Sequence, residues 1–155
     1  MRGNLACQRS PCWLPSPLFF FIYLCLTSLP SLTHIFHPVV YFVSIQQYTA
    51  SIDPKKLSSS VRTLLPAASR LPAKNFELKV AKEPDSDRLT GFTHNSVSPY
   101  GTLSRVPIIV SAALKEEVSF MYMGGGDVDL KVGASVEEFV RSTEAFVLDV
   151  SNPKP

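Results

Sequence analysis

Residue types that could carry catalysis are few in this chain of 155 residues. Its three histidines are His34, His37 and His94, and the first two lie in or beside an unusual N-terminal segment. A Ser/His/Asp or Cys/His triad would therefore have to be built on His94. The chain contains no G-x-S-x-G, Walker A, G-x-G-x-x-G or H-E-x-x-H motif. Because these motifs are missing, the sequence does not support conventional nucleophilic, nucleotide-binding or zinc-protease chemistry.

A metal or disulfide site is also disfavoured. The cysteines are Cys7, Cys12 and Cys25, an odd number crowded at one end of the chain, and Cys7-x4-Cys12 has no second ligand pair nearby. Asp127 and Asp129 lie two residues apart in an alternating segment, which predicts one strand face. With no histidine or third carboxylate close in sequence, a solvent-exposed face is the better interpretation. We expect neither a metal nor another cofactor.

Two glycine-containing segments are the best candidates for binding a ligand. The stretch from Leu89 to Gly101 reads LTGFTHNSVSPYG and predicts an extended loop that presents backbone N–H groups and small hydroxyls. Binding residues concentrate on loops held by a rigid sheet, although a plain connector is the alternative. The second segment, Gly124 to Gly126, lacks the Lys-Ser/Thr ending of a phosphate loop. Taken alone, this triple glycine favours a tight hairpin turn.

The elements that must position these segments begin near residue 39. Residues 39–45 are β-branched and aromatic, which predicts a buried strand, and residues 76–80 alternate like a half-exposed strand. Asp53 followed by Pro54 predicts a helix start. The apolar face of that helix would comprise Leu57, Val61, Leu64 and Leu65.

The C-terminal half of the chain predicts short strands and helices without an internal repeat. Residues 82–90 are polar and could form a short helical turn, and Ser135 to Glu138 forms a capping-box pattern before a helix. Further strands are predicted over 108–110, 118–123, 127–132 and 146–148. The whole pattern predicts class α/β (α+β): a mixed, mostly antiparallel sheet with flanking helices.

Residues 1–38 differ from this body in charge. Arg2 and Arg9 are their only charged residues, whereas residues 53–155 carry 13 basic and 13 acidic residues. The formal net charge of +2 therefore belongs to the N-terminal part. Non-specific nucleic-acid binding through a broad basic surface is disfavoured.

The N-terminal part also differs in composition. Its apolar run Leu18–Leu26 is shorter than the roughly 20 residues of a transmembrane helix, and prolines interrupt its surroundings. A secretory signal peptide is one interpretation, although a small-x-small cleavage site is missing. Translated pyrimidine-rich non-coding sequence and a transit or anchoring segment are the others. We predict residues 1–38 as an unrelated leader and residues 39–151 as the folded domain.

Several sequence blocks, in order, resemble the YbaK/prolyl-tRNA synthetase-associated editing domain. The blocks are TGFTHNSVSPYG, VPIIVS, YMGGGDVDLKVG, VEEFV and FVLDVS. The resemblance spans about Val39 to Ser151 and is strongest from Leu89. It implies a mixed sheet surrounded by helices. It also implies an aminoacyl-tRNA deacylase, which hydrolyses the ester of a mischarged amino acid on tRNA, inside a synthetase or in trans.

The resemblance implies catalysis without a side-chain nucleophile. In this family a positioned water and a ribose hydroxyl would act, and the protein would supply the pocket and backbone donors. The G-x-x-x-P loop of the family matches Asn95, Ser96, Val97, Ser98 and Pro99, with Asn95 in place of the leading Gly. These residues are expected to position the water and the substrate. The expected substrate-binding residues are Gly91, His94, Ser98, Pro99, Gly101, Gly124, Gly125 and Gly126, with a surface histidine as the alternative for His94.

The resemblance also sets expectations about the rest of the protein. The family has upstream strands, a helix and a pocket lysine that nothing in residues 1–38 resembles, so we expect an N-terminally truncated domain, which could be inactive in this form. A non-catalytic tRNA- or aminoacyl-binding module and a small secreted or membrane-attached protein are the alternatives. Expected partners are the acceptor end of aminoacyl-tRNA and an aminoacyl-tRNA synthetase, with no stable membrane partner. The expected location is cytoplasmic, or organellar or secretory if the leader is a targeting signal.

Overall fold

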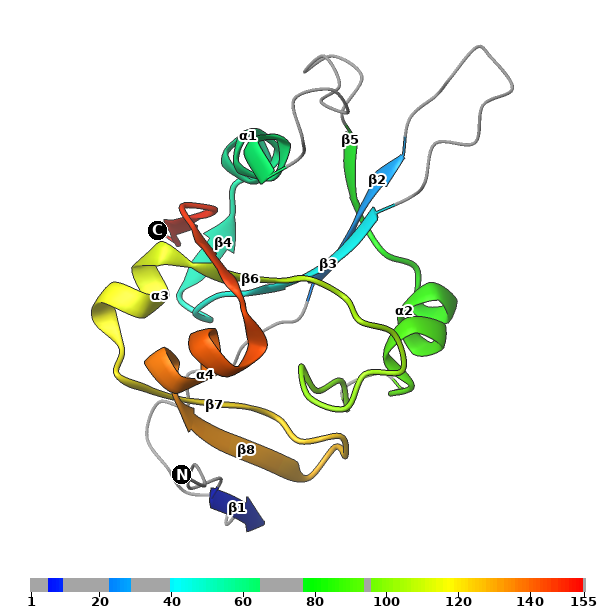
Figure 1. Ribbon diagram of the computed structural model, residues 1–155, viewed down its shortest axis with the longest axis vertical. Helices are drawn as coiled ribbons and strands as arrows, with labels where there is room; N and C mark the ends of the chain where they lie inside the picture. Colours follow the sequence, from blue (N-terminus) through cyan, green and yellow to red (C-terminus); the bar gives the residue numbers. More distant parts are fainter. Residues whose placement is uncertain (1–5, 10–22, 29–39, 65–76, 94–95, 155) are drawn as a thin grey trace.

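A five-stranded sheet forms the centre of the computed structural model, which describes residues 6–9, 23–28, 40–64, 77–93 and 96–154 (Figure 1). Strand β2 runs antiparallel to both of its neighbours, β5 and β3, whereas β3, β6 and β9 run parallel to one another. In spatial order the strands are β5 (Glu77–Val80), β2 (Tyr23–Ser28), β3 (Val40–Ile45), β6 (Ile108–Ser111) and β9 (Phe146–Leu148).

Two smaller antiparallel sheets complete the strand pairing. One has the order β1-β8-β7, and in the other β10 pairs with β4. Their bounds are β1 (Ala6–Arg9), β8 (Leu130–Ser135), β7 (Phe120–Gly124), β10 (Ser151–Pro153) and β4 (Ala50–Ile52). Antiparallel pairs outnumber parallel ones, which confirms the predicted mixed, mostly antiparallel architecture.

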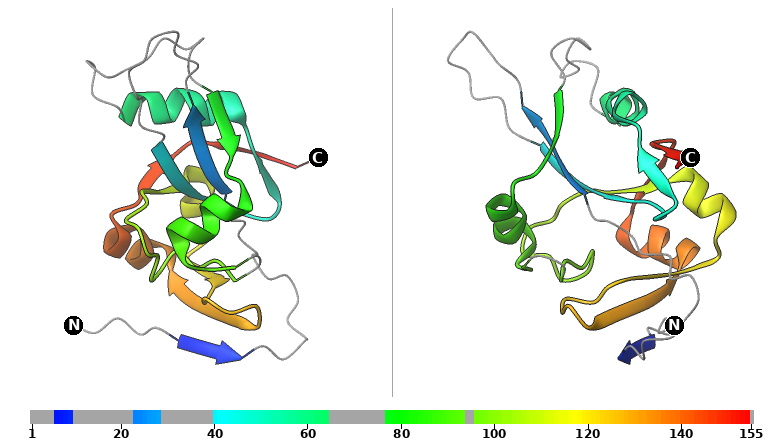
Figure 2. Two further views of the ribbon diagram at one scale, coloured as in Figure 1. Left: turned by 90° about the vertical axis from the view of Figure 1, so that its right-hand side faces the viewer. Right: turned by 180° about the vertical axis from the view of Figure 1, so that it is seen from behind.

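The helices cover the central sheet on two sides. Helix α1 lies on the side away from the β7–β8 hairpin, and α4 lies between that hairpin and the central sheet (Figure 2). Helix α3 follows β6 directly, and α2 leads into the loop that precedes β6 (Figure 1). Their bounds are α1 (Pro54–Leu64), α2 (Glu83–Thr90), α3 (Ala112–Glu117) and α4 (Val136–Thr143).

The core is divided in two because β3 alternates its side chains between the faces of the sheet. Phe42 packs on the α1 side, whereas Val43 and Ile45 pack on the opposite side. The α1-side cluster comprises Phe42, Leu57, Val61, Ile109 and Val150. The larger cluster on the other face includes Val43, Ile45, Val110, Leu114, Met121 and Phe139.

Helix α1 confirms the helix predicted from Asp53-Pro54. The Asp53 carboxylate caps it, because Oδ1 accepts the backbone N–H groups of Lys55 at 2.8 Å and Lys56 at 3.2 Å. Its other oxygen accepts a hydrogen bond from the amide of Asn152 at 2.9 Å, which ties β10 to the helix start. These bonds, led by the one from Lys56, hold the pKa of Asp53 below its ordinary value. Leu57 and Val61 are buried as predicted, and Leu65 lies outside the described residues.

The β7–β8 turn corrects the predicted strand over 127–132. Strand β8 begins only at Leu130, because the Leu130 N–H closes a turn onto the Asp127 carbonyl at 3.2 Å. The Asp127 carboxylate also accepts the Asp129 N–H at 3.3 Å. The two aspartates therefore lie in a turn and do not share a strand face.

The helix starts also differ in detail from the prediction. Ser135 precedes α4 as predicted but makes no side-chain cap; the Val136 N–H instead donates to the Ser119 carbonyl at 3.0 Å. The polar segment in which a short helical turn was considered forms the longer, two-turn helix α2, and α3 was not predicted.

Parts of the predicted leader pair with strands of the body. In β2, Cys25 stands opposite Phe42 of β3 and Val80 of β5, so β2 separates these two strands. In β1, Cys7 stands opposite Val132 of β8. Most of residues 1–38 lies outside the described residues, and the division of the chain at residue 38 stays a prediction.

We expect Asp53→Ala to lower the urea midpoint at pH 7, because the mutation removes the cap of α1 and the link to Asn152. The folded-state pKa of Asp53 is below its ordinary value of 3.8. The stability that the carboxylate contributes is therefore complete above pH 3.8 and lost as the pH falls through the lower folded-state pKa. The difference in urea midpoint between wild type and Asp53→Ala should therefore become smaller in that acid range. Asp129→Ala, in the exposed β7–β8 turn, serves as the control. A difference between wild type and Asp53→Ala that stays constant with pH would refute the role of the Asp53 charge.

Candidate functional site

The loop between α2 and β6 is closed at its base by hydrogen bonds around Thr90. This fully buried threonine donates from Oγ1 to the Ser86 carbonyl at 2.8 Å and accepts the Phe92 N–H at 3.2 Å. The C-terminal part of the loop bonds to the same residue, because the Leu103 N–H donates to the Thr90 carbonyl at 3.3 Å. Gly91 supplies the left-handed turn, with φ 78°, that starts the loop. The two ends of the loop are therefore held together on α2.

Inside the loop, two buried serine hydroxyls hold the backbone. The N–H and Oγ of Ser96 both donate to the Thr93 carbonyl, at 3.1 and 2.8 Å. The Oγ of Ser98 accepts the Tyr100 N–H at 3.1 Å. These bonds fix the course of residues 96–100, which is what a site built on backbone groups requires. His94 and Asn95 lie outside the described residues.

The loop backbone packs directly onto the glycine that ends β7. A Cβ atom added to Gly124 would overlap the Val97 carbonyl oxygen and come within 3.9 Å of the Ser96 carbonyl oxygen. Only glycine leaves room for this approach. The structure therefore brings together two segments that are about 25 residues apart in the sequence and that both contain predicted site residues.

The ring of Phe92 joins the same cluster. A Cβ on Gly126, where φ is 98°, would lie 3.0 Å from Cε1 of this ring, and one on Gly101, where φ is 72°, would lie 4.0 Å from Cζ. The ring therefore lies beside both left-handed glycines. Sequence reasoning did not single out Phe92, although an aromatic residue inside an otherwise small and polar loop was the available signal.

Two predicted site glycines have neighbours of a different kind. Gly91 faces the Leu103 side chain at the base of the loop. Gly125 faces the Leu130 side chain, and its N–H donates to the Leu130 carbonyl at 3.0 Å, which closes the hairpin. The cluster at the loop is thus formed by Phe92, Ser96, Val97, Ser98, Gly101, Gly124 and Gly126, with Pro99 buried beside Ser98.

Tyr100 anchors the far side of the loop on α4. Its ring packs edge-on against the fully buried Phe139, with ring centres 5.5 Å apart and an interplanar angle of 80°. Burial raises the pKa of the Tyr100 phenol; a hydrogen bond with Ser142 opposes this shift and the Glu138 charge adds to it. The loop is therefore attached to α2, β7 and α4, which are three separate elements of one core.

The chemistry available at this cluster is positioning by backbone groups and small hydroxyls. Within the described part of the chain, no group of three or more His, Cys, Asp or Glu residues could hold a metal ion. None of the helices placed there is long and apolar enough to cross a membrane. The roles of the individual site residues stay predictions.

Comparison with solved structures supports the fold and nothing finer. A crystal structure described as a "putative trans-editing enzyme for prolyl tRNA synthetase" superimposes with a TM-score of 0.70 at 15% identity, covering 96% of this chain and 87% of the other. A hypothetical protein matches with a TM-score of 0.68 at 16% identity, over 90% of this chain and 77% of the other. A structure from computational epitope grafting onto scaffold proteins has a TM-score of 0.71 at 15% identity, over 96% and 87% of the two chains. The chain matches no protein-family model and no curated protein sequence.

We expect Thr90→Val to destabilise the protein by about 1–3 kcal/mol, because valine keeps the shape of this fully buried side chain but removes both hydrogen bonds of its hydroxyl. Thr102→Val is the matched control. The Thr102 hydroxyl donates to the Ser104 carbonyl at 2.9 Å, but the side chain is only half-buried, so water replaces the bond. The control should change stability by less than about 0.5 kcal/mol in urea unfolding. Equal losses in the two variants would contradict the anchoring role of Thr90.

Proposed function

We propose that this protein is an aminoacyl-tRNA deacylase that hydrolyses the ester of a mischarged tRNA in trans. The observation that carries the proposal is the direct packing of the Ser96 and Val97 backbone on Gly124, which holds the loop against the second glycine segment. The fold likeness to a structure described as a "putative trans-editing enzyme for prolyl tRNA synthetase" agrees with this class of protein. The reaction itself rests on the sequence resemblance and on this geometry.

The proposed reaction needs no nucleophilic side chain. A water molecule attacks the ester carbonyl, a tetrahedral oxyanion forms, and the ester bond breaks to give a free amino acid and a ribose hydroxyl. The backbone N–H groups of Val97 and Ser98 would stabilise the oxyanion, and a neighbouring ribose hydroxyl would orient the water. Ser96 and Ser98 contribute by holding the backbone in place, since their hydroxyls bond to loop backbone groups.

The left-handed glycines and Phe92 suggest how the substrate would be held. The Phe92 ring packs against Gly126 but the residue is only partly buried, so the terminal adenosine or the amino acid could reach its exposed part. A base stacked on an aromatic ring gains affinity without requiring a basic surface. This agrees with a body in which acidic and basic residues are balanced. The proposed partners are the acceptor end of aminoacyl-tRNA and a synthetase, in the cytoplasm.

A non-catalytic binding module is the second candidate, and Asn95 favours it. This residue stands where the family loop has glycine, and a side chain at that position changes the backbone angles available to the loop. Such a module would keep the cluster around Phe92 and bind the acceptor end without turnover.

Release of the amino acid from a panel of mischarged tRNAs tests the proposal. We expect the full chain to release at least one amino acid faster than spontaneous hydrolysis does. Gly124→Ala should slow this release by about 100-fold, because its Cβ displaces the Val97 carbonyl and with it the loop.

Gly133→Ala is the matched control on the neighbouring strand. Its added Cβ would meet the exposed ends of the Phe120 and Tyr122 rings, which can move aside, whereas Gly124 faces backbone. We expect release by Gly133→Ala to stay within about threefold of wild type, because exposed side chains adjust at little cost. If the folded chain binds tRNA but releases no amino acid, the deacylase proposal is rejected and the non-catalytic binding module remains.

A further inference from the structure

Two arginines are exposed at the base of the loop that carries the candidate site. The Ser104 N–H donates to the Leu89 carbonyl at 2.9 Å, which ties the C-terminal part of the loop to the end of α2. Arg88 precedes Leu89 and Arg105 follows Ser104, so each arginine is next to a residue of this hydrogen-bonded pair. Their side chains are 64% and 90% exposed. Backbone contacts therefore hold two cationic side chains where the loop begins and ends.

An exposed apolar side chain belongs to the same region. Leu103 is 76% exposed, and a Cβ atom added to Gly91 would lie 2.8 Å from its Cγ. A single exposed leucine is common on protein surfaces. This one, however, continues the candidate site, because Gly91 is the residue before Phe92. The base of the loop thus combines two cations with one apolar group.

The ion pairs of both arginines are exposed and easily exchanged. The Nη2 of Arg88 lies 3.5 Å from Oδ1 of Asp85, and the Nη2 of Arg105 lies 2.7 Å from Oε2 of Glu144. Exposed ion pairs contribute little to stability, so either guanidinium can leave its carboxylate for another anion. A guanidinium binds a phosphate through two parallel hydrogen bonds. The arginines are therefore suited to phosphate groups on a binding partner.

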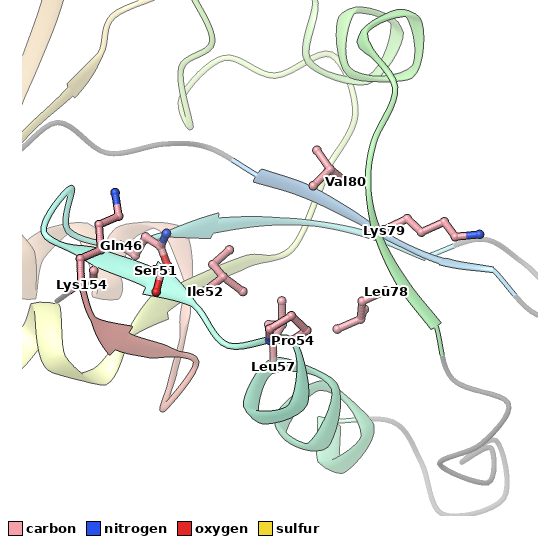
Figure 3. A pocket seen from close by; sticks show the side chains of 10 residues that line it. Gln46, Ser51, Ile52, Pro54, Leu57, Leu78, Lys79, Val80 and Lys154 are labelled. Carbon is pink, nitrogen blue, oxygen red and sulfur yellow. The ribbon is translucent and has the colours of Figure 1, made fainter.

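An apolar hollow of about 320 Å³ on the α1 side of the central sheet is less suited to such a partner (Figure 3). Leu57 and Leu78 are among the residues that line it, and the side chain of Lys79 points away from it. The Nζ of Lys154, at the other end, lies 4.6 Å from the centre of the Tyr48 ring. The base of the loop is therefore the better place for a phosphate backbone to bind.

We propose that Arg88, Leu103 and Arg105 form the surface that binds the sugar-phosphate backbone of the tRNA acceptor stem. This surface rests on the proposed function, which brings the 3′ end of the tRNA to Phe92. The two guanidinium groups would bind phosphates, and Leu103 would pack on a ribose or on the last base pair. Double-stranded RNA offers such phosphate and ribose contacts, whereas an acidic protein surface offers only the charge.

An RNA hairpin with the shape of an acceptor stem and a single-stranded CCA end, carrying no amino acid, tests this surface without requiring hydrolysis. Arg88→Gln and Arg105→Gln should each weaken binding to the full chain about fivefold at low salt. Each should also reduce the slope of log K against log salt by about 1, because one phosphate contact is lost. Lys115→Gln is the control, since Lys115 is exposed on α3, on the other side of the molecule from α2 (Figure 1). Equal effects of the control and the arginine variants would overturn the proposal.

Two further changes separate direct contact from a general effect of charge. Glu144→Gln should tighten hairpin binding about twofold, because Arg105 loses the carboxylate that competes with phosphate. Glu116→Gln, on α3, removes the same charge and should leave binding within about 1.5-fold. Leu103→Ala should weaken binding about threefold without changing the salt slope, because only an apolar contact is lost. Equal tightening by both glutamate variants would show that only net charge matters and would refute the surface.

Hairpin binding and amino-acid release are separate measurements, so this surface and the proposed deacylase can fail independently. If the full chain binds the hairpin through both arginines but releases no amino acid, hydrolysis is rejected and the surface is supported. If the double variant of Arg88 and Arg105 binds the hairpin and releases amino acid like wild type, the deacylase stands and the surface is refuted. A wild-type chain that does not bind the hairpin would also refute the surface.

Discussion

The central parallel strands must be covered on both faces, and this constraint organises the molecule. Strands β3 and β6 are apolar apart from Ser44 and Ser111 and alternate their side chains, so Phe42 and Ile109 face one side while Val43 and Val110 face the other. Helix α1 covers the first face. Helices α3 and α4 with the β7–β8 hairpin cover the second.

The loop cluster illustrates how a site can be built with little side-chain chemistry. Thr90 closes the base of the loop, Ser96 and Ser98 bond to its backbone, and Tyr100 packs on α4. Each of these interactions is modest, but together they leave the backbone few alternatives. The Val97 carbonyl then packs directly on Gly124, so no side chain fits between the loop and the β7–β8 hairpin at this point. Rigidity of this kind is what positioning and electrostatic stabilisation require.

The opposite face has the reverse character. There the packed side chains are apolar, and the Ser44 Oγ and the Gln46 Oε1 are buried without hydrogen-bond partners. Buried side-chain oxygens are normally paired, so each unpaired one is costly. In the loop, by contrast, the hydroxyls of Thr90, Ser96 and Ser98 are all hydrogen-bonded to backbone groups.

Local sequence signals predicted the elements whose cause is local. Asp53-Pro54 predicted α1 because the capping carboxylate bonds to N–H groups two and three residues away. Short runs of β-branched, aromatic and other apolar residues predicted β3, β6 and β9, and the overall class followed from the order of the elements. Helix α3 was missed because its six residues follow β6 without a separating turn signal. The pair β4–β10 was missed because each strand has three residues and gains its partner from about 100 residues away.

The candidate site, too, was predictable from the sequence only in part, and the rest depended on tertiary contacts. The sequence by itself determined which segments could bind a ligand, since glycine, proline and small hydroxyls have local conformational consequences. Only the tertiary structure decided that Gly124 meets the Val97 carbonyl, that Phe92 lies beside Gly101 and Gly126, and that Gln46 is left unpaired. These contacts join residues far apart in the chain. Their existence depends on how the layers pack, which no short sequence pattern encodes.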